Sequence, residues 1–234
     1  MIAFDHGSVL LIGSGRLAQH LRYWNSLLPN PNSLLCWDRS QGIEQLHLLI
    51  KKSSLVWLAI SDSALVPFYE EHLTELKKPV VHFSGALFDV RIPSAHPLMS
   101  FPRALLDAPT YPKIHFALSG AATLHELMPG FTNSFSIMPE KDKALYHALC
   151  VMSGNFPQLL WSETFPQLSQ LEIPEAAINL YLTQITENFI KYRSNALTGP
   201  LIRRDQNTIE KNLRALTDSK LKKVYQSFVE EFTK

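Results

Sequence analysis

An α/β fold, with a doubly wound parallel sheet followed by a smaller all-α domain, is what this 234-residue sequence predicts. Short apolar runs typical of buried strands alternate with helical patterns over residues 1–139. From residue 140 onward the pattern is helical, and we find no internal repeat or low-complexity tract. The sequence therefore predicts two domains, residues 1–139 and residues 140–234.

The expected strands are short, and the first is a continuous apolar run, residues 8–13, that ends at a glycine. Such a run is typical of a strand buried on both faces of a parallel sheet. Later runs predict strands at residues 33–37, 54–60 and 79–84, and then, after a proline-rich connection, at residues 113–118 and 134–138.

Helical patterns separate the first of these strands from one another. Residues 16–28 carry apolar side chains at helical spacing, a weaker pattern follows at residues 40–52, and a third helix is expected through residues 64–76. Asp62 can cap the last of these helices. Alternation of this kind favours right-handed crossovers between parallel strands.

The C-terminal domain is expected to contain only helices, at residues 140–161, 173–197, 205–216 and 219–234. A Ser153-Gly154-Asn155 segment interrupts the first of them. Asp205 is the expected N-cap of the third helix, and Asp218 or Ser219 that of the fourth.

Charge and composition exclude several classes of function. The 22 Lys and Arg residues nearly balance the 21 Asp and Glu residues, which gives no support for nucleic-acid binding. The apolar runs are too short to span a bilayer, and the first residues lack the positive charge of a signal peptide. Cys36 and Cys150 match no metal-ligand spacing. We therefore expect a cytoplasmic protein without a metal site or a membrane or nucleic-acid partner.

The segment "GSGRLA" has the G-x-G-x-x-A pattern at the junction of the first strand and the first helix, as in a Rossmann dinucleotide site. Gly13 permits the tight turn, Gly15 lets a pyrophosphate approach the backbone, and Ala18 allows close packing of helix on strand. The first helical turn, with Arg16 and Leu17, offers N–H groups to the phosphates. The alternative is a glycine-rich turn that binds no nucleotide.

The end of the second strand bears on the choice between NAD and NADP. Asp38 can hold the ribose hydroxyl groups of NAD, whereas Arg39 and Ser40 can hold the 2′-phosphate of NADP. We favour NADP slightly, because two adjacent donors can clamp a phosphate; the alternative is a solvated turn. Ser61 and Asp62 follow the third strand, at the sheet edge where the nicotinamide end belongs.

These segments resemble the Rossmann-like NAD(P)-dependent oxidoreductases that include pyrroline-5-carboxylate reductase, the deazaflavin-dependent NADP reductases and relatives of 6-phosphogluconate dehydrogenase. More narrowly, the chain is similar to proteins that carry the domain of unknown function numbered 2520. The segments that carry this resemblance are "GSGRLAQHL", "WLAISDSAL", "VVHFSGAL", "SAHPLMSF", "ALYHALCVMSGN" and "NALTGPLIRRDQNTIEKNLRAL".

The chain departs from that family pattern in two places. The family's Ser-Asn pair becomes Ser153-Gly154-Asn155, and Arg204 stands where the family has a glycine before Asp205. The resemblance implies a Rossmann fold and an NAD(P) cofactor, and it implies no particular substrate.

A hydride transfer needs a proton donor near the nicotinamide and groups that orient the substrate. His96, expected in a proline-bounded loop after the fourth strand, is the acid–base candidate because imidazole titrates near neutral pH. Ser84, at the end of that strand, can donate to the substrate or to the cofactor carboxamide. The alternatives are a structural histidine and a serine that satisfies a turn.

Tyr146 and His147 are adjacent on a predicted helix, and their side chains point about 100° apart. We therefore do not expect both side chains to face the same point. Asn155 lies about two turns beyond His147 and can share its face, so His147 and Asn155 are further catalytic candidates and Tyr146 is a weaker substrate-binding candidate. The alternative is ordinary core packing. In the "NALTGPLIRRDQ" segment, Thr198, Arg203 and Asp205 are weaker substrate-binding candidates, and helix termination accounts for most of that segment.

These observations favour an oxidoreductase that transfers a hydride between NAD(P) and a small carbonyl, imine or alcohol. The rival interpretation is a dinucleotide-binding sensor without catalysis, and a third is a Rossmann fold that has lost its nucleotide. The resemblance also implies a homodimer through the C-terminal helices.

Overall fold

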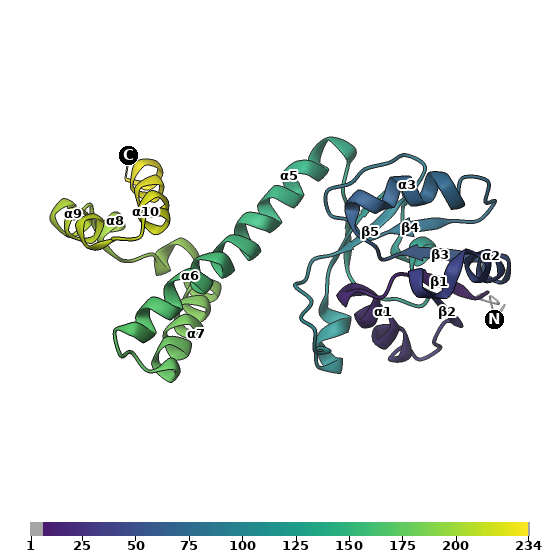
Figure 1. Cartoon of the computed structure of the whole chain (residues 1–234), viewed down its shortest axis with the longest axis horizontal. Helices are drawn as coiled ribbons and strands as arrows, with labels where there is room; N and C mark the ends of the chain where they lie inside the picture. Colours follow the sequence, from purple (N-terminus) through teal and green to yellow (C-terminus); the bar gives the residue numbers. More distant parts are fainter. Residues whose placement is uncertain (1–6, 234) are drawn as a thin grey trace. The chain divides into compact units, whose positions relative to one another are not determined.

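The computed structural model describes residues 7–233, and the last residue of the predicted C-terminal helix lies outside them. The chain divides into two compact units, Met1–Asn155 and Phe156–Lys234 (Figure 1). The strands are β1 (Val9–Ile12), β2 (Leu34–Trp37), β3 (Leu55–Leu58), β4 (Val80–His82), β5 (Ser94–Pro97), β6 (Phe116–Ser119) and β7 (Phe135–Ile137).

The helices of the N-terminal unit are α1 (Arg16–Ser26), α2 (Gly42–Lys52), α3 (Asp62–His72), α4 (Leu124–Leu127) and α5 (Glu140–Cys150). Three further helical segments are the 3₁₀ turns Arg39–Gln41 and Ala108–Lys113 and the π-helical turn Val151–Asn155. The sequence prediction missed α4 and the second 3₁₀ turn, both of which are short.

The strands form one sheet in the order β2-β1-β3-β4-β5-β6-β7. Neighbouring strands are parallel except for β5 and β6, so the predicted Rossmann-type sheet is confirmed with one antiparallel pair. The prediction that His96 lies in a loop was wrong. His96 is in β5, because Ser94 to Pro97 pair with Ser119 to Phe116 of β6.

Alternate residues of the strands enter two hydrophobic cores, one on each face of the sheet. Leu11, Trp57 and Val81 face the side covered by α1, where Leu21 and Trp24 are buried. The opposite set, which includes Val56 and Leu58, packs on α2 and α3. Because both faces are covered, the first strands read as continuous apolar runs.

Helix α5 belongs to the N-terminal compact unit, although the strand-to-helix change at residue 140 set our sequence boundary. Lys143 of this helix is 2% exposed and donates a hydrogen bond to Ser94 of β5. The predicted Ser-Gly-Asn interruption lies within the π-helical turn Val151–Asn155 that follows α5.

The C-terminal unit contains α6 (Phe156–Gln170), α7 (Glu175–Tyr192), α8 (Pro200–Arg203), α9 (Gln206–Ala215) and α10 (Ser219–Phe232), together with the 3₁₀ turn Arg193–Ala196. Asp218 caps α10 through the N–H groups of Lys220 and Leu221. Within residues 7–233, no helix has the length and hydrophobicity that are needed to cross a membrane.

Candidate functional site

The glycine-rich turn joins β1 to α1. Gly13 has a φ of +124°, and a Cβ on it would lie 2.3 Å from the carbonyl oxygen of Ala59. A side chain at residue 13 is therefore excluded by the backbone angle and by the neighbouring chain segment. Gly15 has a φ of −68°, and a Cβ on it would meet nothing within 4 Å. A ligand can therefore approach the backbone at Gly15 closely.

The N-terminus of α1 is suited to binding an anion. Gly15 is its N-cap, no side chain caps the helix, and the first turn contains no acidic residue. The first N–H groups of an α-helix have no partner within the helix, and the helix dipole makes that end positive. A diphosphate is a ligand of the right charge for such a position.

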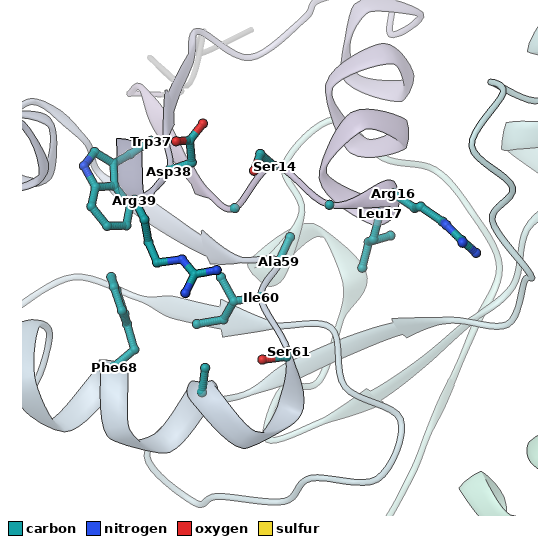
Figure 2. Close-up of a pocket in the computed structure, with 13 residues that line it drawn as sticks. Ser14, Arg16, Leu17, Trp37, Asp38, Arg39, Ala59, Ile60, Ser61 and Phe68 are labelled. Carbon is teal, nitrogen blue, oxygen red and sulfur yellow. The ribbon is translucent and has the colours of Figure 1, made fainter. Parts of the chain in front are cut away.

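A pocket of about 760 Å³ lies beside this turn (Figure 2). Its walls are the segments that follow β1, β2 and β3, namely residues 13–17, 37–39 and 59–61, together with Ala64 and Phe68 of α3. Ile12 is in register with Trp37 and with Leu58, so the three segments leave the sheet at one level. Pockets of this size in proteins hold small organic ligands and cofactors.

Asp38, at the end of β2, caps the 3₁₀ turn that follows it. Its Oδ1 accepts hydrogen bonds from the Ser40 N–H at 2.9 Å and from the Ser40 hydroxyl at 2.6 Å. These bonds hold the pKa of Asp38 below its ordinary value. The Ser40 hydroxyl therefore donates to Asp38, and it could donate to a phosphate only by leaving that bond.

Arg39 lines the pocket, whereas Ser40 is not among its walls. Figure 2 shows the Arg39 side chain running from the end of β2 toward Ile60, while Arg16 points away from it. We expected Arg39 and Ser40 together to hold a phosphate. Of these two donors, only Arg39 lines the pocket.

The pocket walls include most of the predicted cofactor residues: Gly13, Gly15, Arg16, Leu17, Asp38, Arg39 and Ser61. Ala18 is instead 1% exposed and packs in the core below α1. Asp62, the first residue of α3, accepts a hydrogen bond from the Ser84 hydroxyl at 2.7 Å.

A second group of polar residues begins at this bond, and we call it the histidine–lysine cluster. It comprises Asp62, His82, Ser84, Ser94, His96, Lys143, Tyr146 and His147. Leu58, His82 and Ser94 are register partners on β3, β4 and β5. The cluster therefore lies at the same level of the sheet as the pocket. The pocket wall follows β3, and His82 and Ser94 of the cluster lie on the next two strands, β4 and β5.

Ser84 holds the turn after β4 in place. Its hydroxyl oxygen accepts from the N–H groups of Ala86, at 3.2 Å, and Leu87, at 2.9 Å, while the hydroxyl donates to Asp62. These bonds match the turn-forming alternative that we considered for Ser84 from the sequence.

His96 contacts both Tyr146 and His147, and this corrects our expectation that those adjacent residues do not face one spot. The His96 Nδ1 lies 2.8 Å from the Tyr146 hydroxyl. The rings of His96 and His147 are 6.4 Å apart, centroid to centroid. A Cβ on Gly85 would lie 2.7 Å from His147 Cδ2 and 2.9 Å from His96 Nε2. The two side chains approach the His96 imidazole from different directions, which a 100° separation on the helix allows.

The pKa values of two cluster histidines, His82 and His96, are low. Burial lowers the pKa of His96 to about 4, helped by His147 and Lys143. Burial, and then Lys143, likewise lower the pKa of His82 to about 4. Both imidazoles are therefore neutral at pH 7, so our sequence argument that His96 titrates near neutrality does not hold in this environment.

His82 has an unusual hydrogen-bonding state. It is fully buried, and its Nδ1 accepts from the Ser84 N–H at 3.2 Å, which leaves the proton on Nε2. Among the residues that the structure describes, Nε2 has no hydrogen-bond partner. A buried donor without a partner is costly and is often associated with a functional site.

Lys143, like Ser94, is a residue of this cluster that was not predicted from the sequence. In the sequence it looks like an exposed helical charge in "EKDKALYH", yet it is buried. Its spacing of three and four residues from Tyr146 and His147 places all three on neighbouring positions of α5, and this was the available signal. Burial lowers the pKa of Lys143 to about 8, although Asp62 acts in the opposite direction.

Asn155 is exposed and lies at the end of the π-helical turn. A π-helical turn has an i to i+5 hydrogen-bond pattern, so the eight residues from His147 to Asn155 do not follow the ordinary helical period. That the two residues share one face stays a prediction.

The remaining candidates lie in the C-terminal unit. Thr198 and Arg203 are exposed. Asp205 caps α9 by accepting from the Thr208 N–H at 3.1 Å and hydroxyl at 2.7 Å, and these bonds lower its pKa. Arg204, before it, has a φ of +55°, which explains why glycine suits this position. Across residues 7–233 no group of three His, Cys, Asp or Glu residues could hold a metal ion.

Comparison with known proteins gives a family match for the C-terminal half. Residues 117–232 match the model described as "Domain of unknown function (DUF2520)". A search of curated protein sequences gives no match.

Solved structures resemble nearly the whole chain at low sequence identity. A candidate NADP oxidoreductase, BF3122 from Bacteroides fragilis, has a TM-score of 0.75 at 18% identity, over 97% of this chain and 98% of that one. Protein TM1727 from Thermotoga maritima has a TM-score of 0.66 at 20% identity, over 96% and 98%. A 1-pyrroline-5-carboxylate reductase from Streptococcus pyogenes has a TM-score of 0.58 at 18% identity, over 97% and 98%. These similarities show the fold.

Proposed function

We propose that this chain, whose C-terminal half carries the DUF2520 domain, is an oxidoreductase that transfers a hydride between NAD(P) and a small carbonyl, imine or alcohol. The pocket beside Gly15 is the observation that carries the proposal, because it combines an open glycine with the uncapped N-terminus of α1. The similar structures named above include reductases, which agrees with this assignment.

The residues at the pocket fit a dinucleotide in a defined order. Gly15 and the first turn of α1 would bind the diphosphate, and Asp38 and Arg39 would lie at the adenosine ribose. Ser61 would lie toward the nicotinamide, with the histidine–lysine cluster beyond it. When bound, the dinucleotide would supply or accept the hydride.

The proposal is tested by measuring the melting temperature with NADPH or NADH, and then the oxidation of each against keto acids, aldehydes and cyclic imines. We expect a rise in melting temperature with at least one cofactor, and turnover of at least one compound. Binding without any turnover would favour the sensor interpretation. An unchanged melting temperature with both cofactors would favour a fold that has lost its nucleotide.

For the cofactor we propose NADP, since Arg39 lines the pocket next to the expected ribose position. Arg39→Ala is expected to weaken NADPH binding about tenfold, or about 1.4 kcal/mol, and NADH binding much less. Isothermal titration with both cofactors measures the difference. Arg214→Ala, which removes an exposed arginine paired with Glu210, is the control for lost charge. Equal losses for NADPH and NADH in Arg39→Ala would refute the preference.

We also propose a homodimer through the C-terminal helices. Helix α7 exposes 68% of Leu180, 67% of Tyr181 and 60% of Ile190, an apolar set that a second copy would cover. Light scattering at micromolar concentration is expected to give twice the chain mass, and Leu180→Glu to give the monomer. Gln45→Glu, at a polar exposed position of α2 in the N-terminal unit, is the matched control. A wild-type monomer would contradict the proposal.

A further inference from the structure

The position of Lys143 suggests a chemical role. Its ammonium group donates to Ser94, the first residue of β5, and Ser94 is the register partner of His82 at the end of β4. The ammonium therefore lies at the level of the sheet where β3 ends and the pocket wall at Ala59 begins. In doubly wound sheets this edge is where ligands bind.

The charge of Lys143 is poorly compensated for so buried a group. It is 2% exposed, and none of the ion pairs found within residues 7–233 includes it. The hydrogen bond to Ser94 uses one of its three N–H groups. A buried ammonium without a paired carboxylate is costly, and such groups occur preferentially at functional sites.

The groups around Lys143 come from several elements. Asp62 of α3 favours its charged form, while burial opposes it, and Lys143 in turn lowers the pKa of His82 on β4 and of His96 on β5. His147 and Tyr146 are its neighbours on α5. Both low-pKa histidines are neutral at pH 7, and burial raises the pKa of Tyr146. Lys143 thus gives the cluster a buried group that can change its charge close to neutral pH.

We propose that Lys143 is the acid–base residue of this site and that Ser94 positions it; this inference rests on the proposed function. In the reducing direction, the hydride goes to the carbonyl or imine carbon of the substrate. An Nζ–H bond of Lys143 breaks as an O–H or N–H bond forms on the oxygen or nitrogen attached to that carbon. Lys143 is left as a neutral amine and regains a proton from water. In the oxidising direction the neutral amine removes the hydroxyl or amine proton of the substrate.

The test uses the full-length protein and the variants Lys143→Met and Lys141→Met, which remove a buried and an exposed lysine from the same helix. Methionine keeps the length of the side chain without its charge, so both variants are expected to fold. Circular dichroism and a melting temperature within a few degrees of the wild type check this.

The first measurement does not depend on a substrate. Lysines labelled with ¹³C at Cε are titrated by NMR, and the resonance lost in Lys143→Met belongs to Lys143. We expect it to titrate near pH 8 and to change its titration when NADPH is added. A Lys143 amine that titrates like the exposed lysines and ignores NADPH would overturn the inference, whether or not any compound is turned over.

The second measurement uses the best compound of the substrate panel. Lys143→Met is expected to lose at least about 100-fold in kcat, with little change in NADPH affinity, whereas Lys141→Met keeps the wild-type rate. The wild-type reduction rate should fall as the pH rises above about 8, and methylamine should partly rescue Lys143→Ala. Turnover of Lys143→Met within a few-fold of the wild type would overturn this inference alone. Absence of binding of both NADPH and NADH to the wild-type protein would instead overturn the proposed function.

Discussion

Replacing Gly13 by alanine is expected to lower the free energy of unfolding by more than about 3 kcal/mol. The new Cβ would lie 2.3 Å from the carbonyl oxygen of Ala59, and a φ of +124° strains any residue other than glycine. Because the clashing atom belongs to the backbone after β3, a side-chain rotation cannot relieve the contact. Urea denaturation at pH 7 measures the loss.

Gly15→Ala is the matched substitution with the opposite outcome. A Cβ at residue 15 meets nothing within 4 Å, and its φ of −68° suits any residue, so the free energy of unfolding should change by less than about 1 kcal/mol. Dinucleotide affinity should nevertheless fall roughly tenfold or more, because the methyl group occupies the space in which a diphosphate would approach the helix. Wild-type affinity in Gly15→Ala would show that the diphosphate does not bind at this turn.

The first half of the fold could be predicted because its signals are local. A continuous apolar run ending in glycine identifies β1, and the same glycines determine the turn and the open approach to α1. The cap at Asp205 is equally local, since it bonds Thr208 three residues away.

Strand β5 could not be predicted, because its sequence does not favour a strand. Ser94, His96 and Pro97 are poor strand formers, and their extended conformation depends on pairing with Ser119 to Phe116 and with His82. Those partners are remote in the sequence, so the decisive contacts are tertiary. The same pairing moved His96 from the expected loop into the sheet.

The chemistry of the cluster was hidden for a related reason. From the sequence we expected His96 to have the ordinary pKa of imidazole. Burial lowers that pKa to about 4, and electrostatic interaction with His147 and Lys143 contributes. Lys143 was overlooked because a lysine in a charged helical segment is usually solvated, whereas this one is buried. Burial decides both cases, and a single sequence shows it poorly.

Acidification from pH 7 to pH 5 is expected to lower the free energy of unfolding substantially, through His82 and His96. Each has a pKa of about 4 in the folded protein, below the ordinary value of 6.5. Between these two values the unfolded chain binds protons that the folded protein does not, so the contribution is complete above pH 6.5 and is lost as the pH falls toward 4.

By pH 5 the two histidines together account for a loss of up to about 4 kcal/mol, before most carboxylates titrate. Urea denaturation at pH 7 and pH 5 measures it. His96→Gln should remove about half of this pH dependence, because glutamine is neutral at both pH values. His115→Gln, which replaces an exposed histidine beside Ser134 and Ser136, is the control for losing a histidine elsewhere. If His96→Gln showed the same pH dependence as the wild type, His96 would accept its proton equally well in the folded and the unfolded protein. The cluster would then be more open to water than its burial indicates.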